Sequence, residues 1–595
     1  MKRMILLGLF YGILLSTSVA DNQTTFNTSE MAGSISKVDR LYYTCKVWGF
    51  LKYYHPKVGS GAYDWDDKLL KVLANTKNIT TEEKFNEYLS RWIYAFGPRK
   101  PCSACRKPPK EEMFLKNFDL SWTRKRPFSA ELQKTFQDIE NNRFQGNHHY
   151  IEKGNVGQFE PKNESSYFDL NWEDENMRLL PLFRYWNYIE YFFPYKYQTD
   201  QPWDEVLKEM IPKFLGASSK LDFHKAILEL VVKVDDGHAG ILSNTLDQWP
   251  YQNYLPAKFE MIEGMAVITE IIDKGKAASD DLRVGDAITA VNGRSVMSLD
   301  AEHAKYVWGS NESAKQGRLF HSLFMGLDGT ATVEIDRAGT KSSRVLNLYH
   351  YSDITYEKAP PAEKFVWLHD SIAYLNLKNL EIKEVSELME EAMESHVLII
   401  DVRNYPKGTY RAIANFLKPE LTEFATFTRP YFEYPGKFRW SGSSKCGKRN
   451  EDYYRGKVIL LFNQKTQSHA EFTCMCFESA PNVVKVGSQT AGADGNVTRF
   501  PLIQKMGTAF SGIGVFYPDR TETQRIGVVP DVVVKPTLAG IRDGRDEVLE
   551  EAVAIAKSEL QRLKTLVPQG IQLIDSLGTD SLQVDSLNAI PEKFR

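Results

Sequence analysis

A serine at the start of a predicted helix is the first candidate for chemistry. Ser468 follows the apolar run 458–462, which is typical of a buried strand, and precedes a helical pattern that begins at Ala470. A turn between strand and helix exposes a hydroxyl and directs backbone N–H groups toward the atom that it attacks. The same position suits a serine that only caps the helix, so a nucleophile and an N-cap both stay open.

A histidine is the second candidate, because a serine nucleophile needs a base within hydrogen-bond reach. The chain has 11 His, and His238 stands out because it follows Asp236-Gly237 directly after the apolar run 227–232. A histidine in a tight Asp-Gly turn is either structural or a base, and spacing alone does not decide between the two.

The segment around Ser468 alternates between strand and helix. Strand patterns lie at 372–377, 397–402 and 458–462, and helical patterns lie at 384–395, 411–416 and 471–479, with a final helix at 547–563. This alternation predicts a layered α/β domain over residues 358–565.

Residues 255–350 have a different character, with short strand patterns and a compact turn motif. The stretch 282–293 reads Leu-Arg-Val-Gly-Asp, an alternating strand, and then Val-Asn-Gly. It resembles the PDZ family, whose members bind extended peptide ends by adding a strand to a sheet edge. A PDZ-like β domain that docks a peptide substrate is therefore expected here.

The N-terminal part contains an internal repeat. The aromatic run 47–56 recurs at 185–194, and the pair Trp65-Asp66 recurs at the same offset as Trp203-Asp204. Each copy is typical of an aromatic helix ended by proline, a loop and a second helix. We expect one helical copy at 31–97, a polar connecting insert at 98–175, and a second copy at 176–250 that ends in the Asp-Gly-His turn.

The order of these motifs resembles that of the S41 peptidases, the C-terminal processing and tricorn-core family, over about residues 180–560. The motifs that carry the resemblance are Asp236-Gly237-His238, the PDZ-like region, Asp401-Val402-Arg403-Asn404, Ser468-His469-Ala470-Glu471, Gly487-Ser488-Gln489-Thr490-Ala491-Gly492 and Gly527-Val528-Val529-Pro530-Asp531. The resemblance implies a multidomain α+β protein with a ClpP/crotonase-like α/β catalytic domain. It also implies a serine-type hydrolase without a metal or organic cofactor.

The resemblance distinguishes two catalytic versions. Processing proteases pair the serine with a downstream lysine in a Gly-Lys-Gly context, but residues 490–496 contain no lysine, and Lys485 and Lys505 lie outside that motif. The tricorn-like version implies Ser468 as nucleophile, His238 as general base and Glu522 as the carboxylate that orients the imidazole. Gln524 would share a strand face with Glu522 and is the alternative neighbour.

The oxyanion hole is also implied by the resemblance. One N–H is that of His469, and the second comes from the turn 405–408, where the family often has glycines. Pro406 has no N–H to give, so Lys407 or Gly408 must serve, and Gly408 is the predicted donor.

Composition and targeting signals indicate where the protein is located and which partners are excluded. The chain of 595 residues carries 74 basic and 77 acidic residues without a block of one sign, which argues against a nucleic-acid binder. Residues 1–20 have the basic start, apolar run and small-residue end of a secretory signal peptide, and no later run is long enough to span a membrane. We expect an exported protein, periplasmic or extracellular.

Cysteines and the tail add two expectations. In an exported protein Cys102 and Cys105 favour a local disulfide over a metal site, and Cys474 and Cys476 favour buried thiols. The tail 566–595 repeats Asp-Ser-Leu at Asp575, Asp580 and Asp585. These triplets resemble O-glycan acceptor sites of exported Bacteroidetes proteins.

The sequence therefore predicts an exported serine endopeptidase or processing peptidase with a peptide or protein substrate. Two alternatives remain. The first is a catalytically silent peptide- or ligand-binding protein on the same scaffold, and the second is a serine hydrolase that acts on a non-peptide substrate.

Overall fold

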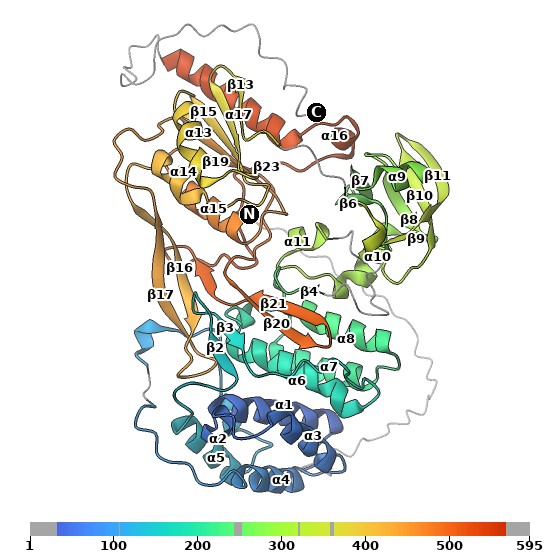
Figure 1. Cartoon of the computed structure of the whole chain (residues 1–595), viewed down its shortest axis with the longest axis vertical. Coiled ribbons are helices and arrows are strands. Elements are labelled where there is room, and N and C mark those ends of the chain that lie inside the picture. Colours follow the sequence, from blue (N-terminus) through green and yellow to red (C-terminus); the bar gives the residue numbers. More distant parts are fainter. Residues whose placement is uncertain (1–32, 106–107, 243–252, 319–321, 357–361, 567–595) are drawn as a thin grey trace, which may run out of the picture.

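The computed structural model describes residues 33–105, 108–242, 253–318, 322–356 and 362–566. The predicted signal peptide (1–20) and the Asp-Ser-Leu triplets lie outside these residues. Figure 1 shows a helical part at one end, an α/β part at the other end, and a smaller β unit beside them.

The helical part contains both copies of the predicted repeat. The first helix of each copy, α1 and α6, is mostly buried and rich in aromatic residues. Copy one comprises α1 (Lys37–Tyr54), α2 (Pro56–Gly59), α3 (Trp65–Thr76) and α4 (Glu82–Tyr94), and copy two comprises α6 (Glu175–Phe192), η3 (Lys196–Gln198), α7 (Trp203–Leu215) and α8 (Lys220–Val232).

One pair of hydrogen bonds occurs in both copies. The indole N–H of Trp48 donates to the Trp65 carbonyl (2.9 Å), and that of Trp65 donates back to the Trp48 carbonyl (3.1 Å). Trp186 and Trp203 form the same reciprocal pair at 2.8 and 3.0 Å. The sequence repeat is thus also a repeat of local structure.

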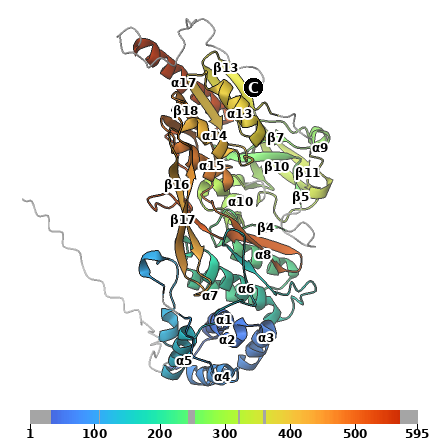
Figure 2. The same ribbon diagram turned by 60° about the vertical axis from the view of Figure 1, so that its left-hand side comes forward.

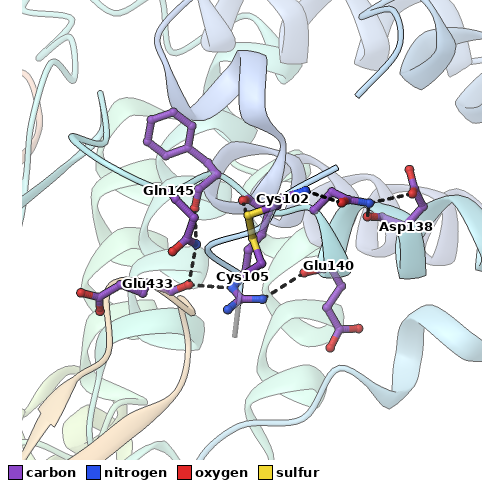
Figure 3. The surroundings of a disulfide bond; sticks show 9 residues. Cys102, Cys105, Asp138, Glu140, Gln145 and Glu433 are labelled. Atoms are coloured by element: carbon purple, nitrogen blue, oxygen red, sulfur yellow. Dashed lines mark hydrogen bonds between the residues drawn. A yellow bond between two sulfur atoms is a disulfide. The ribbon is translucent and has the colours of Figure 1, made fainter. Parts of the chain in front are cut away.

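The insert between the copies is ordered by short elements and a disulfide. Its elements are η1 (Lys110–Glu112), β1 (Met113–Phe114), η2 (Ser121–Arg124), α5 (Ala130–Asn141), β2 (Ile151–Lys153) and β3 (Phe159–Pro161). Cys102 and Cys105 form the predicted disulfide, and Figure 3 shows it beside Glu433, which belongs to a distant segment of the chain. Cys474 and Cys476 are the predicted buried thiols.

The β unit beside the other two parts (residues 253–350, the middle unit) is built on one antiparallel sheet in the order β11-β10-β8-β7-β6, with β9 paired to β8. Strand β6 therefore lies at the edge of this sheet. The elements are β5 (Asn253–Tyr254), β6 (Ala257–Ile262), β7 (Met265–Ile271), α9 (Lys274–Ser279), β8 (Ala287–Val291), β9 (Arg294–Ser295), α10 (Val296–His303), η4 (Ala304–Tyr306), α11 (Glu312–Gln316), β10 (Thr330–Arg337), β11 (Thr340–Asn347) and β12 (Tyr349–His350).

The α/β part is built on a second sheet in the order β13-β14-β15-β18-β19-β23, parallel from β14 onward. Its central strands are apolar on both faces because helices cover both sides. The strands are β13 (Phe365–His369), β14 (Ile372–Asn376), β15 (Val397–Asp401), β18 (Lys457–Phe462), β19 (Val483–Gly487) and β23 (Val532–Val533), and the helices are η5 (Tyr351–Asp353), η6 (Ile382–Glu384), α13 (Val385–Ala392), α14 (Tyr410–Leu417), α15 (His469–Glu478), α16 (Leu538–Arg542) and α17 (Glu547–Leu566).

A long hairpin joins the α/β part to the helical part. Strands β16 (Thr422–Pro430) and β17 (Phe438–Cys446) extend away from the parallel sheet toward the helices, as Figures 1 and 2 both show. At the hairpin tip, the Tyr54 hydroxyl donates to the Pro435 carbonyl (2.6 Å), and Arg143 Nε donates to the Glu433 carbonyl (2.6 Å). The helical part therefore holds the tip by several polar contacts.

Three further strands connect the same two parts. Strand β22 (Gly514–Phe516) extends the hairpin sheet, while β20 (Val497–Ile503) and β21 (Met506–Ser511) pair with each other. Strand β4 (Ile241–Leu242), which follows the second helical copy, pairs with β21. Within the described residues, no helix combines the length and apolar composition that a membrane crossing needs.

The repeated tryptophan pair gives a first prediction. Trp48→Phe and Trp186→Phe each remove one indole donor and leave a buried carbonyl without it, so each should lower the free energy of unfolding by about 1–2 kcal/mol. Urea denaturation of the two variants checks this. A clear loss of unfolding free energy in one variant and none in the other would contradict the structural equivalence of the two copies.

Candidate active site

Ser468 lies at the end of the turn that connects central strand β18 to α15. Its backbone adopts φ 60° and ψ −126°. This conformation is uncommon for a residue with a side chain and costs about 1–3 kcal/mol. An ordinary N-cap residue adopts extended backbone angles without that cost. The turn thus has the strained form that presents a side chain at the end of a strand, as in a nucleophile elbow.

The Glu471 side chain stabilises this turn by hydrogen bonds. Its buried carboxylate accepts hydrogen bonds from the N–H of Ser468 (3.1 Å), the N–H of Gly492 (2.7 Å), the N–H of Ala493 (3.0 Å) and the hydroxyl of Thr490 (2.6 Å). Burial raises the pKa of Glu471, and the four donors oppose that effect. One carboxylate therefore joins the backbone of the strained serine to the loop 490–493.

His238 belongs to a turn that follows α8. Its Nδ1 lies 2.9 Å from the Ser511 hydroxyl, which in turn lies 3.0 Å from Oδ1 of Asp236. The His238 Nε2 is buried and has no hydrogen-bond partner among the described residues. The ring is thus held through one nitrogen, while the other is available to a reacting group.

Asp236 is the buried charge beneath His238. Its other oxygen, Oδ2, accepts from the N–H of Ser511 (2.6 Å), and its Oδ1 accepts from the N–H of His238 (3.1 Å). Burial alone would raise the pKa of this carboxyl, but the His238 imidazole and these hydrogen bonds outweigh it and lower the pKa. Asp236 is therefore a carboxylate that stabilises a protonated imidazole.

The two turns are packed against each other at Gly237. A Cβ added to Gly237 would lie 2.8 Å from the Cβ of Ala493 and 3.2 Å from the Gln467 amide oxygen. Ala493 accepts the Ser468 N–H through its carbonyl (3.0 Å), and Gln467 directly precedes Ser468. Glycine is needed here because of this close approach. The structure therefore brings the His238 turn and the Ser468 turn together.

Glu522, predicted to orient His238, forms other contacts in the structure. Its carboxylate accepts from Lys116 Nζ (2.7 Å), the Tyr197 hydroxyl (2.9 Å) and the Gln198 side chain (2.8 Å). Gln524 is the residue that reaches the site, with its amide nitrogen 3.4 Å from Asp236 Oδ1. The two side chains diverge because residues 523–526 leave the strand conformation and form a turn. The carboxylate that contacts His238 is that of Asp236.

The two predicted oxyanion-hole residues lie close to each other. Gly408 has φ +76°, and a Cβ added to it would lie 3.9 Å from Nε2 of His469. The His469 ring is packed near Tyr405 and Tyr410, with ring centroids 6.2 and 5.5 Å away. The N–H of His469 is the first of helix α15, where backbone donors have no partner within the helix. The loop 405–408 is therefore next to the nucleophile turn.

Two roles escaped the sequence prediction. Ser511 lies far from Asp236 and His238 in the chain, and nothing in its surroundings marks it. Glu471 could have been found, because a carboxylate three residues after a serine at a helix start is the pattern of a capping box. No group of three or more His, Cys, Asp or Glu side chains within the described ranges is placed to hold a metal ion.

The region around Ser468 is similar to a known protein family. Peptidase family S41 matches residues 371–534, which include Ser468, Glu471 and Gly408. The match assigns this region to family S41. The matched family is one of peptidases, and the match is confined to residues 371–534 of the chain. Whether the processing or the tricorn-like version applies stays a prediction.

Individual relatives are distant. Two crystal structures, one of mature CPAF complexed with lactacystin and one of a CPAF mutant, have TM-scores of 0.50 and 0.51 and sequence identities of 14% and 15%. They cover 66% and 68% of this chain and 98% and 99% of their own chains, and at that identity they show a shared fold.

A curated relative, the nisin-resistance protein of Lactococcus lactis subsp. lactis, is 29% identical over 103 residues, which is 16% of this chain. The chain matches about a third of that protein's length, 32%.

Glu471 gives a second prediction. Glu471→Gln keeps the side-chain volume but replaces one acceptor oxygen by an NH₂ group that faces donors, so the free energy of unfolding should fall by about 2–3 kcal/mol. Chemical denaturation followed by tryptophan fluorescence checks this. The control is Glu478→Gln on the same helix, whose carboxylate is partly exposed to solvent and should cost less than about 1 kcal/mol. Equal losses would contradict the role of Glu471.

Proposed function

We propose that the chain is a serine peptidase in which Ser468 is the nucleophile, His238 is the general base, and Asp236 orients His238 through Ser511. The observation that carries this proposal is the unpartnered, buried Nε2 of His238, in a turn packed against the strained Ser468 turn. The other ring nitrogen of His238 is connected through Ser511 to the buried carboxylate of Asp236, whose charge favours a protonated imidazole.

The proposed chemistry is acyl transfer in two steps. Ser468 Oγ attacks the peptide carbonyl while His238 Nε2 takes its proton, and the N–H groups of His469 and Gly408 receive the developing oxyanion. His238 then returns the proton to the leaving amine. Water attacks the acyl-enzyme with His238 again as base, which releases the acid and restores the Ser468 hydroxyl.

The hydrogen bonds that connect His238 to Ser511 and Asp236 determine the tautomer of His238. When Nδ1–H donates to the Ser511 hydroxyl, that hydroxyl can donate to Asp236, and Nε2 is left as the acceptor that a general base needs. The negative charge of Asp236 then favours the imidazolium that forms as Ser468 loses its proton. Ser511 thus bridges His238 Nδ1 and Asp236 Oδ1, which lie 3.7 Å apart.

The proposed substrate is a peptide or protein, brought to the site by the middle unit acting as a PDZ-like domain. The Leu-Arg-Val-Gly-Asp turn supports this, since Gly285 has a positive φ and Asp286 accepts from the N–H of Arg283 (2.9 Å). Edge strand β6 also contacts the loop before Ser468, where Gln464 donates to Glu260 (2.9 Å). A peptide added to this edge would lie near the nucleophile. Export to the periplasm or the exterior is part of the proposal.

The nucleophile gives a third prediction. Ser468→Ala should abolish hydrolysis of a casein or peptide-library substrate and abolish labelling by a fluorophosphonate probe, while the unfolding transition is kept. Mass spectrometry of the labelled wild-type chain should locate the adduct on Ser468. Full peptidase activity in the variant would refute the assignment, and labelling without any peptide cleavage would favour a non-peptide hydrolase.

The acid gives a fourth prediction, with a matched pair of variants. Asp236→Asn should lower the turnover number by about 10²–10⁴-fold, because it removes the charge that stabilises the imidazolium. Glu522→Gln should change it by less than about threefold, because Glu522 contacts Lys116, Tyr197 and Gln198 instead. Steady-state kinetics of both variants check this, and a large loss in Glu522→Gln alone would reinstate Glu522 as the orienting acid.

A further inference from the structure

A segment of the middle unit reaches into the candidate active site. It comprises residues 308–318 and includes α11, which Figure 1 shows between the middle unit and the α/β part. Asn311 donates to the carbonyls of Thr490 (2.9 Å) and Arg525 (3.0 Å), and the Ser310 hydroxyl accepts from the N–H of Gly237 (2.6 Å). The segment therefore contacts the His238 turn and the α/β part at once.

Arg318, at the end of this segment, connects the two turns directly. One guanidinium nitrogen, Nη2, donates both to the carbonyl of Gly237 (3.1 Å) and to the side-chain oxygen of Gln467 (2.7 Å). The other terminal nitrogen, Nη1, donates to the carbonyl of Trp308 (2.9 Å) in its own segment. The Gly237 carbonyl belongs to the peptide bond of His238, and Gln467 is bonded to Ser468. Arg318 thus holds the residue before the base and the residue before the nucleophile.

The partners of Arg318 are unusual for a cation. Within the described part of the chain its three acceptors are neutral oxygens, and no carboxylate lies at ion-pair distance. The guanidinium also lies over the Trp308 ring, 5.5 Å from the ring centroid. Burial lowers the pKa of Arg318 to about 10, and the charge of Asp236 opposes that effect. Removing a cation from water without an ion pair costs stability, and the ring contact offsets part of that cost, whereas the planar fork of donors fixes several acceptors at once. The arrangement favours a role in geometry over a role in stability.

We propose that Arg318 is a positioning residue for the reaction, which sets the placement of His238 relative to Ser468 by holding Gly237 and Gln467 together. The proposal rests on the proposed function. Lysine cannot reproduce it, because a single ammonium lacks the planar set of donors that reaches three acceptors in three parts of the fold. The middle unit thereby supplies part of the catalytic geometry, in addition to any contact with substrate.

The test measures the rate at which a fluorophosphonate probe labels Ser468 at increasing probe concentration. The curve gives two quantities, the maximal labelling rate and the affinity for the probe. Arg318→Ala should lower the maximal rate by about 10²-fold, the effect of a misplacement of about 1 Å, and leave the probe affinity within about threefold. Arg318→Lys should recover only part of the rate. Guanidinium ion at a low, non-denaturing concentration should accelerate Arg318→Ala, because it can occupy the vacated space, and should not accelerate the wild type.

The matched control is Arg542→Ala. Arg542 donates to the carbonyl of Gly285 (3.0 Å) and to Asp336 (2.9 Å), so it also joins the α/β part to the middle unit, but away from the two turns. It should keep at least about half of the maximal rate. Comparable losses in Arg542→Ala and Arg318→Ala would mean that docking of the middle unit matters and that Arg318 has no specific role.

The remaining outcomes are also decisive. A wild-type chain that is not labelled at Ser468 refutes the proposed function itself. A labelled wild type with an unchanged Arg318→Ala, or with a loss only in probe affinity, refutes the positioning role and leaves the function standing. If Arg318→Ala does not fold, Arg318→Lys decides, since a full rate in that variant would show that only the positive charge is required.

Discussion

The candidate site depends on the close contact of Gly237 with Ala493 and Gln467, two residues next to Ser468. The base and the nucleophile come from distant parts of the chain, and this contact packs their two turns together. Any side chain at position 237 would separate the turns, because a Cβ would meet Ala493 at 2.8 Å. The remaining features of the site keep this contact in place from three directions.

Each of the three parts of the fold contributes a different interaction. From the α/β part, the four donors to Glu471 fix the strained backbone of Ser468. From the helical part, α8 delivers the His238 turn, and pairing of β4 with β21 places Ser511 next to Asp236. From the middle unit, Arg318 joins the two turns. Strain at Ser468 is thus supported by surrounding structure, which is the condition for its persistence.

Much of this organisation could be predicted from the sequence, because it depends on short-range patterns. The apolar runs of the parallel sheet, the helix after Ser468, and the offset between Trp48 and Trp186 are all local signals, and the structure confirms them. The order of the motifs also indicated family S41, which the family match confirms. Gly408 lies near the His469 ring, and the roles of both residues as oxyanion donors stay a prediction.

The parts that failed depend on contacts between distant elements. Glu522 was implied by the family resemblance and by the need for a carboxylate, but the backbone turns at 524–526, and Gln524 approaches Asp236 instead. The partner of His238 is Ser511, which comes from a strand whose pairing with β4 no local pattern reveals. Arg318 lies in a separate unit of the fold. In these cases the tertiary arrangement, and not the residue's own neighbours in sequence, decides what a side chain contacts.

The hairpin β16–β17 has a consequence for the boundaries of the protein. It lies within the region that matches family S41, yet its tip is held by Tyr54 and Arg143 of the helical part. Helix α17, which covers one face of the parallel sheet, lies beyond the matched region. A fragment cut at residues 371 and 534 would lose the hydrogen bonds at the hairpin tip and would expose the apolar sheet face that α17 covers. The family match therefore delimits an evolutionary unit, whereas the unit that folds includes segments from nearly the whole described chain.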